Sequence, residues 1–189
     1  MHYNSNSFSS NSNIKKRSPR NVPDRENRYM GLAFWMASFS KDPDTQVGAV
    51  VISDNNEPLG WGYNGPPREI SDFQVNWDRP YKYDFMRHAE INAITFCGGR
   101  NLKGATLYVT APPCKKCMLD IAASQIRKII YFPYQSKDGN SMLHKYEDLV
   151  IAEEIAKLAS ITLSEFKGNL NWMRDRIEWM ANLGIFDLP

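Results

Sequence analysis

Apolar and polar residues alternate along this chain in blocks that predict five helices and five strands. Between residues 25 and 39 the apolar side chains recur every three to four positions, which is typical of an amphipathic helix. Apolar runs at 47–52 and 59–63 are separated by turn-forming residues, and therefore predict a hairpin of two strands. The same reasoning predicts further helices at 88–97, 113–124, 145–159 and 170–182, and further strands at 106–110, 128–132 and 161–166.

The order of these elements predicts the fold class. Helices and strands alternate after the hairpin, and such alternation is typical of helices packed on both faces of one sheet. We therefore expect an α/β fold, a three-layer α/β/α sandwich with a central mixed five-stranded sheet. Residues 65–86 are rich in proline and aromatic residues and show no clear period, which predicts a long loop. Loops of that length inside compact domains are usually functional or mobile.

Charge and composition divide the chain into three segments. Residues 1–23 are rich in Asn and Ser and hold four basic and no acidic residues, so they carry +4 of a net charge of +2 and the remainder carries −2. Such a segment buries too little apolar surface to fold, which predicts a disordered polar and basic tail. A solvated tail is the simpler interpretation, and a basic arm that touches nucleic acid or a partner is the alternative. We expect one domain over 24–167 and a helical extension over 168–189, packed on the domain or at a subunit interface.

Composition also excludes several classes of protein. The chain has 189 residues, of which 42% are hydrophobic, enough for one domain with a sizeable core. Its apolar runs are too short for a membrane span, and no apolar stretch near the start resembles a secretory signal. Three cysteines are too few for a disulfide framework and indicate a reducing compartment, so we expect the cytoplasm, or the host cytoplasm for a viral protein.

Two cysteines lie three positions apart at the start of a predicted helix. At a helix N-terminus the sulfurs of Cys114 and Cys117 can face one point, where the dipole and the free N–H groups favour thiolates. Thiolate is the form that binds zinc. Taken alone, the pair is equally compatible with a metal site, a redox pair or two core thiols.

A histidine at the start of another predicted helix changes that balance. His88 with Cys114 and Cys117 would give zinc three ligands, and the open fourth position indicates a bound water and hence catalysis. Glu90 follows two residues after His88 and could move protons between that water and a leaving amine. The order H-x-E and then P-C-x-x-C is the signature of zinc nucleobase deaminases. Cys97, the remaining cysteine, is interpreted as a small buried apolar residue.

Further segments resemble the zinc-dependent cytidine deaminase superfamily, and within it the deoxycytidylate deaminase family. These segments are SKDP at 40–43, TQVGA at 45–49, GYNGPP at 62–67, HAEINAI at 88–94 and GATLYVT at 104–110. The resemblance covers roughly residues 26–166. It implies hydrolysis of dCMP to dUMP and ammonia, which supplies dUMP for thymidylate synthesis. It also implies that water attacks C4 of the cytosine while Glu90 protonates N3 and then the departing ammonia.

The resemblance assigns further residues to the substrate. Asn64 is expected to bond the sugar or base, the backbone of Ala89 to meet the pyrimidine edge, and Tyr134 to close over the nucleotide. A phosphate needs cationic or N–H donors, and Lys41 is the leading candidate because it lies in a family-like loop. The other candidates are Arg68, Arg87 and Lys137. Each of these basic residues has a solvated surface charge as its alternative interpretation.

The resemblance also allows assembly and feedback. Many members are homohexamers activated by dCTP and inhibited by dTTP, and Mg²⁺ could accompany the regulatory triphosphate. The regulatory loop would include Gly65, Ser71 and Asp72, although residues 68–73 otherwise depart from the family pattern. We expect a nucleotide substrate and a homo-oligomer, with no membrane partner.

Three other functions remain as alternatives. A tRNA or other nucleic-acid deaminase shares the zinc signature, but the slightly acidic body does not favour polynucleotide binding. Free cytidine deaminases commonly have Cys where this chain has His88. A zinc-binding module without catalysis would have no use for an open ligand position beside Glu90.

Overall fold

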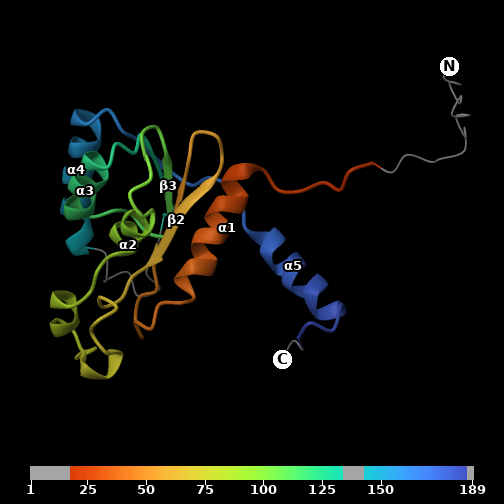
Figure 1. The fold of residues 1–189 in the computed structure, drawn as a ribbon, viewed down its shortest axis with the longest axis horizontal. Coiled ribbons are helices and arrows are strands. Elements are labelled where there is room, and N and C mark those ends of the chain that lie inside the picture. The colour runs from red at the N-terminus through yellow and green to blue at the C-terminus, as the bar shows by residue number, and fades with distance from the viewer. Residues whose placement is uncertain (1–17, 134–142, 187–189) are drawn as a thin grey trace, which may run out of the picture.

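A single mixed sheet forms the centre of the molecule (Figure 1). The computed structural model describes residues 18–133 and 143–186, and the strand order is β2-β1-β3-β4-β5. β1 pairs antiparallel with β2 and β3, whereas β3, β4 and β5 run parallel to one another. The strands are β1 Gly48–Ile52, β2 Pro58–Tyr63, β3 Thr106–Val109, β4 Lys128–Tyr131 and β5 Thr162–Glu165.

Helices cover both faces of this sheet, as Figure 1 shows. One face packs α2, α3 and α4 against alternating strand residues such as Val51, Leu107 and Ile129. The opposite face packs α1 against the intervening residues, among them Val50 and Ile130. The helices are α1 Arg25–Ala37, α2 Ala89–Phe96, α3 Lys115–Ala123, α4 Leu143–Leu158 and α5 Asn171–Asn182. This arrangement confirms the predicted three-layer α/β/α sandwich.

Glycines on the hairpin allow the helices to approach the sheet closely. A methyl group added at Gly48 would lie 2.0 Å from the carbonyl oxygen of Ala33 in α1. A methyl group added at Gly62 would lie 2.4 Å from the backbone nitrogen of Ala93 in α2. Helix backbone therefore packs directly on strand backbone at both places, and the start of α2 is held close to the end of β2.

The long loop between β2 and α2 contains more structure than its sequence predicts. Two short 3-10 helices, η1 Asp72–Gln74 and η2 Tyr81–Asp84, lie within it. The side chain of Ser71 caps η1 by accepting a hydrogen bond from the backbone N–H of Phe73. Polar contacts such as this one order the loop, which explains why no hydrophobic period marks these turns.

The last helix, α5, lies beside α1 and outside the main sandwich (Figure 1). No residue of α5 is buried. Its first turn packs on α1 through Trp172, because a methyl group added at Gly31 would lie 2.5 Å from Cζ2 of that indole. Among the described residues, no helix combines the length and the apolar character that crossing a membrane requires.

Candidate active site

The N-termini of α2 and α3 carry the residues of the predicted metal site. His88 is the N-cap residue of α2, and Cys114 is the N-cap residue of α3. Cys117 lies on the first turn of α3, and its backbone N–H donates to Sγ of Cys114 at 3.5 Å. A helix N-terminus offers free N–H groups and the positive end of the helix dipole. The local structure therefore favours an ionised thiol at the N-cap position of Cys114, and a thiolate is the form that binds metals.

The three side chains converge on one point. Nδ1 of His88 lies 3.5 Å from Sγ of Cys114 and 3.2 Å from Sγ of Cys117, and all three ligand atoms lie within 4.8 Å of one another. Zinc bonds of about 2.3 Å to sulfur and about 2.0 Å to nitrogen place the nitrogen and each sulfur about 3.5 Å apart in a tetrahedral site. The distances between these side chains fit that geometry, and three ligands leave one position for a further ligand.

The two thiols of the cluster differ in their affinity for protons. Hydrogen bonding from Cys117, helped by His88 and opposed by burial, lowers the pKa of Cys114 to about 4. The same interaction with Cys114, together with burial, raises the pKa of Cys117. The pair therefore shares one proton at neutral pH, and a bound cation would replace that proton to give two thiolates.

Glu90 supplies a buried carboxyl group next to the cluster. Only 4% of the residue is exposed, although it lies on the first turn of α2. Burial raises the pKa of the Glu90 carboxyl, and the nearby charge of His88 acts in the opposite direction. Hydrogen bonding with the neighbouring Cys117 thiol also acts to lower the pKa of Glu90, but burial outweighs it. A carboxyl group with a raised pKa accepts and releases protons closer to neutral pH, which suits it to proton transfer beside a metal.

A short backbone bridge connects the end of β2 to the start of α2. The N–H of Gly65 donates to the carbonyl of Arg87 at 3.1 Å, and the N–H of Arg87 donates to the carbonyl of Gly65 at 2.9 Å. Asn64 and Gly65 are thereby held next to the residue that precedes His88. Asn64 is 8% exposed and Ala89, which directly follows His88, is fully buried.

The other predicted substrate and regulatory residues have different positions. Lys41 and Asp72, predicted respectively as a phosphate contact and a regulatory residue, form an ion pair with each other. Ser71 is exposed and caps η1. The guanidinium of Arg68 lies 4.3 Å from the ring centre of Phe96. Tyr134 and Lys137 lie outside the described residues.

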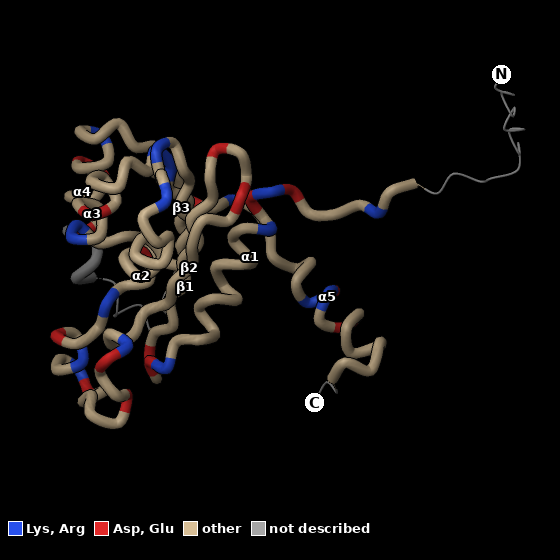
Figure 2. Tube along the Cα trace, in the orientation of Figure 1, with Lys and Arg blue, Asp and Glu red and all other residues tan. Residues whose placement is uncertain are grey.

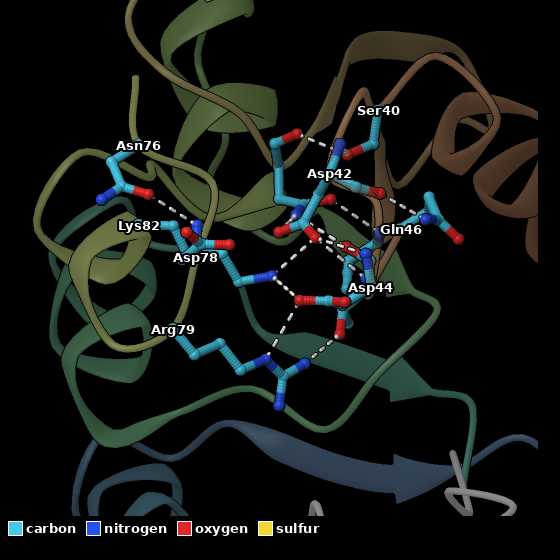
Figure 3. A network of polar contacts seen from close by, with 11 residues as sticks. Ser40, Asp42, Asp44, Gln46, Asn76, Asp78, Arg79 and Lys82 are labelled. Atoms are coloured by element: carbon cyan, nitrogen blue, oxygen red, sulfur yellow. Dashed lines mark hydrogen bonds and ion pairs between the residues drawn. The ribbon is translucent and has the colours of Figure 1, made fainter.

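Sequence reasoning missed a buried ion-pair network that joins the loop before β1 to η2 (Figure 3). Lys82 is 1% exposed, and its Nζ lies 2.7 Å from Oδ1 of Asp42 and 2.7 Å from Oδ2 of Asp44. Arg79 reaches the same carboxylate of Asp44 at 3.2 Å from the solvent side. Burial lowers the pKa of Lys82, but the hydrogen bonds to the two aspartates outweigh it and raise the pKa. No spacing rule could have found these partners, which lie about 40 positions apart.

Cys97 has the role expected of it. The residue is 2% exposed, and its thiol donates a hydrogen bond of 3.2 Å to the carbonyl of Ala93 within α2. The thiol therefore lies in the core and does not belong to the ligand cluster formed by His88, Cys114 and Cys117.

Comparison with known proteins decides the family. The model of the cytidine and deoxycytidylate deaminase zinc-binding region matches residues 23–133, which include the ligand cluster and Glu90. This chain belongs to that family. Mouse deoxycytidylate deaminase is 34% identical over 144 residues, 73% of this chain and 77% of the mouse protein. Deoxycytidylate deaminase of Mycobacterium phage D29 is 35% identical over 126 residues, 58% of this chain and 94% of the phage protein.

The fold agrees with the family. The structure of dCMP deaminase from cyanophage S-TIM5 in apo form matches with a TM-score of 0.57 and 22% identity, over 77% of this chain and 100% of that one. The shared fold and the named relatives confirm that the chain is a deaminase with a cytidine deaminase fold.

Proposed function

We propose that this deaminase converts dCMP and water to dUMP and ammonia with one zinc ion per chain. The observation that carries the proposal is the cluster of His88, Cys114 and Cys117 beside the buried carboxyl of Glu90. The name and the 34% identity of the mouse relative favour dCMP over other substrates. The dUMP formed would supply thymidylate synthesis.

The residues of the site have separate tasks in this reaction. His88, Cys114 and Cys117 would hold the zinc, which when bound supplies a Lewis acid that lowers the pKa of water towards neutrality. Glu90 takes a proton from the attacking water and delivers it to N3 of the cytosine ring. Glu90 then takes the second proton and passes it to the exocyclic amine, which leaves as ammonia. Its raised pKa suits both the uptake and the release of these protons.

Substrate binding is assigned to residues around the cluster. Asn64 bonds the sugar or base, and the backbone of Ala89 meets the pyrimidine edge. Lys41 reaches the phosphate in exchange for its exposed ion pair with Asp72, whose side chains are 69% and 32% exposed. Exposed ion pairs are weak, so a phosphate can displace the carboxylate. Arg68, Arg87 and Lys137 are the other candidate phosphate contacts, and Tyr134 is the candidate ring over the base.

An assay of four substrates side by side tests the function. Zinc-loaded protein is given dCMP, dCTP, deoxycytidine and adenosine-containing RNA, and released ammonia is measured. We expect dCMP to have the highest kcat/KM. Ammonia from RNA but not from dCMP would overturn the proposal in favour of a nucleic-acid deaminase.

The charge of the loop between β2 and α2 does not favour binding of a polynucleotide. In Figure 2, Lys and Arg alternate with Asp and Glu along this loop.

Assembly into a homo-oligomer, a hexamer by family resemblance, is a further part of the proposal. An apolar groove of about 430 Å³ between α1 and α5 supports it. Trp35 in its lining is half-exposed, and α5 carries a second half-exposed tryptophan, Trp179. The apolar side chains of its lining are Val22, Pro23, Leu32, Trp35, Trp172, Met173, Ile177 and Met180. Size exclusion with light scattering should show that the parent protein is larger than a monomer and that Ile177→Glu is dissociated. A monomeric parent protein would overturn the proposal.

Feedback control is proposed through the loop that holds Gly65, Ser71 and Asp72. Activation by dCTP with Mg²⁺ and inhibition by dTTP should appear as changes in the rate of dCMP turnover or in the melting temperature. If neither quantity responds at millimolar dTTP, feedback is overturned. We also propose a reducing compartment, the cytoplasm, because Cys97, Cys114 and Cys117 are all free thiols.

A further inference from the structure

Lys82 is the most deeply buried cation among the described residues, and it lies outside the catalytic cluster. Its ammonium group contacts Asp42 and Asp44, both on the loop between α1 and β1 (Figure 3). Asp42 is itself only 4% exposed. Taking an ammonium out of water is expensive unless it is paired and hydrogen-bonded, so this contact fixes the loop of η2 onto the loop of residues 40–46.

Asp42 connects Lys82 to a predicted substrate residue. Oδ1 of Asp42 accepts from Lys82, and also from the backbone N–H groups of Asp44 at 2.9 Å and Thr45 at 3.0 Å. Its second oxygen, Oδ2, accepts from Nδ2 of Asn64 at 3.5 Å. The charge on Asp42 therefore faces the amide of Asn64 on one side and the ammonium of Lys82 on the other.

These contacts set the orientation of the Asn64 carboxamide. Its two N–H groups face the carboxylate of Asp42 and the carbonyl of Thr45, the latter at 2.9 Å. Its Oδ1 accepts from the backbone N–H of Val47 at 2.7 Å. The reversed amide would turn Nδ2 towards the Val47 donor and Oδ1 towards two acceptors, which is unfavourable. Among the described contacts of the Asn64 side chain, one lone pair of Oδ1 has no donor, and it can accept a hydrogen bond from a ligand.

The backbone of Asn64 and Gly65 connects the 40–47 segment to the metal site. Ser40 donates from its hydroxyl to the carbonyl of Asn64 at 2.8 Å, and the N–H of Asn64 donates to the carbonyl of Val47 at 3.0 Å. The next residue, Gly65, forms the bridge with Arg87 that precedes His88. The 40–46 loop is therefore hydrogen-bonded directly to Asn64, and Asn64 is joined through Gly65 to the residue before His88.

We propose that Lys82 is a positioning residue, which fixes the Asn64 carboxamide so that its Oδ1 accepts a hydrogen bond from the substrate. By pairing with Oδ1 of Asp42, Lys82 fixes the position of that carboxylate, so that its Oδ2 faces the amide and holds it in one orientation. This inference rests on the proposed function, since it assigns a positioning role for the dCMP site.

Steady-state kinetics with dCMP test the role of Lys82. In Lys82→Met we expect KM to rise roughly tenfold, the worth of one ordinary hydrogen bond, with kcat within about threefold of the parent protein. Zinc content should remain one per chain. Asn64→Ala should raise KM similarly. The double variant Lys82→Met/Asn64→Ala should not exceed Asn64→Ala alone by more than about twofold, because Lys82 acts through Asn64.

Two further variants keep the test decisive. Arg79→Met removes an exposed cation from the same Asp44 carboxylate without touching Asp42, and should leave KM within about twofold. If Lys82→Met folds poorly, the charge-balanced variant Lys82→Met/Asp44→Asn replaces it, with the same rise in KM expected.

Two results would overturn the inference. One is an unchanged KM in the Lys82 variants. The other is a double variant whose rise in KM equals the product of the rises in Lys82→Met and Asn64→Ala, which would show that Lys82 does not act through this amide. Turnover of dCMP by the parent protein distinguishes the two proposals. If the parent protein releases no ammonia from dCMP, the proposed function is wrong. If it turns over dCMP normally and KM does not change in the Lys82 variants, only the positioning role is wrong.

Discussion

Sγ of Cys117 lies 3.2 Å from Nδ1 of His88, although the two residues are 29 positions apart in the chain. Each belongs to the N-terminal end of a different helix, α2 or α3, and both helices pack on the same face of the sheet. The ligand cluster therefore forms only when the sheet has assembled. A metal bound to such a cluster stabilises the fold as well as the chemistry, because the unfolded chain does not hold the ligands together.

Cys117→Ser should abolish both metal binding and activity. A serine hydroxyl does not ionise at neutral pH, so the cluster keeps two good ligands in place of three. We expect zinc per chain, measured by atomic absorption, to fall well below one, with a lower melting temperature and no detectable release of ammonia. Cys97→Ser is the matched control, since Cys97 is a buried thiol outside the cluster. It should keep its zinc and its activity; a Cys117→Ser protein with full zinc and turnover would contradict the assignment.

Glu90→Gln should separate metal binding from proton transfer. Glutamine keeps the size and hydrogen-bonding shape of the side chain but cannot carry a proton between water and the leaving amine. General acid–base groups contribute typically about 10²–10⁴-fold to rates, so kcat should fall by at least that range while zinc stays bound. Glu154→Gln, an exposed position on α4, serves as the control and should not change kcat. An active Glu90→Gln enzyme would exclude this carboxyl as the proton carrier.

The sequence predicts most of the fold because hydrophobic periodicity and turn chemistry determine it. The predicted helix at 25–39 corresponds to α1, which ends at Ala37, shortly before the turn-forming Asp42 and Pro43. The run at 47–52 corresponds to β1, every residue of which is buried. His88 and the two cysteines could be found because metal ligands keep a fixed spacing at helix N-termini.

Contacts between distant polar residues could not be predicted in the same way. Lys82 lies between two tyrosines in a loop without a period, and nothing in its neighbours indicates that it is buried against Asp42. The ion pair between Lys41 and Asp72 likewise joins two loops that approach only in the folded chain. Ion pairs need no local pattern, so only the tertiary structure identifies the partners.

Gly62→Ala should displace α2 and weaken the metal site. The added methyl group would lie 2.4 Å from the backbone nitrogen of Ala93 and 2.6 Å from the carbonyl oxygen of Ala89, and backbone atoms cannot give way without moving the helix. Overpacking of this kind costs about 1–3 kcal/mol, so thermal unfolding should begin at a lower temperature and zinc affinity should fall. Gly65→Ala, three residues along, meets nothing within 4 Å and should leave the melting temperature unchanged. Equal melting temperatures for both variants would contradict this close packing of α2 on β2.

Asp44→Asn should destabilise the protein at neutral pH but not in strong acid. The hydrogen bond and charge of Lys82 lower the pKa of Asp44 below its usual 3.8, so the pair stabilises the fold above about pH 4 and this stabilisation is lost as pH falls through the lowered value. At the alkaline end, the raised pKa of Lys82 keeps this stabilisation complete up to about the usual 10.5, and it is lost as pH rises through the raised value. Urea midpoints of the variant should lie below those of the parent protein at pH 7 and converge with them at the acid end. Comparing the two proteins at each pH cancels the loss of metal that acid causes in both.

Asp54→Asn, which changes an exposed carboxylate in the β1–β2 turn, is the control and should give no difference at any pH. A difference for Asp44→Asn that persists unchanged at low pH would contradict an ionic origin.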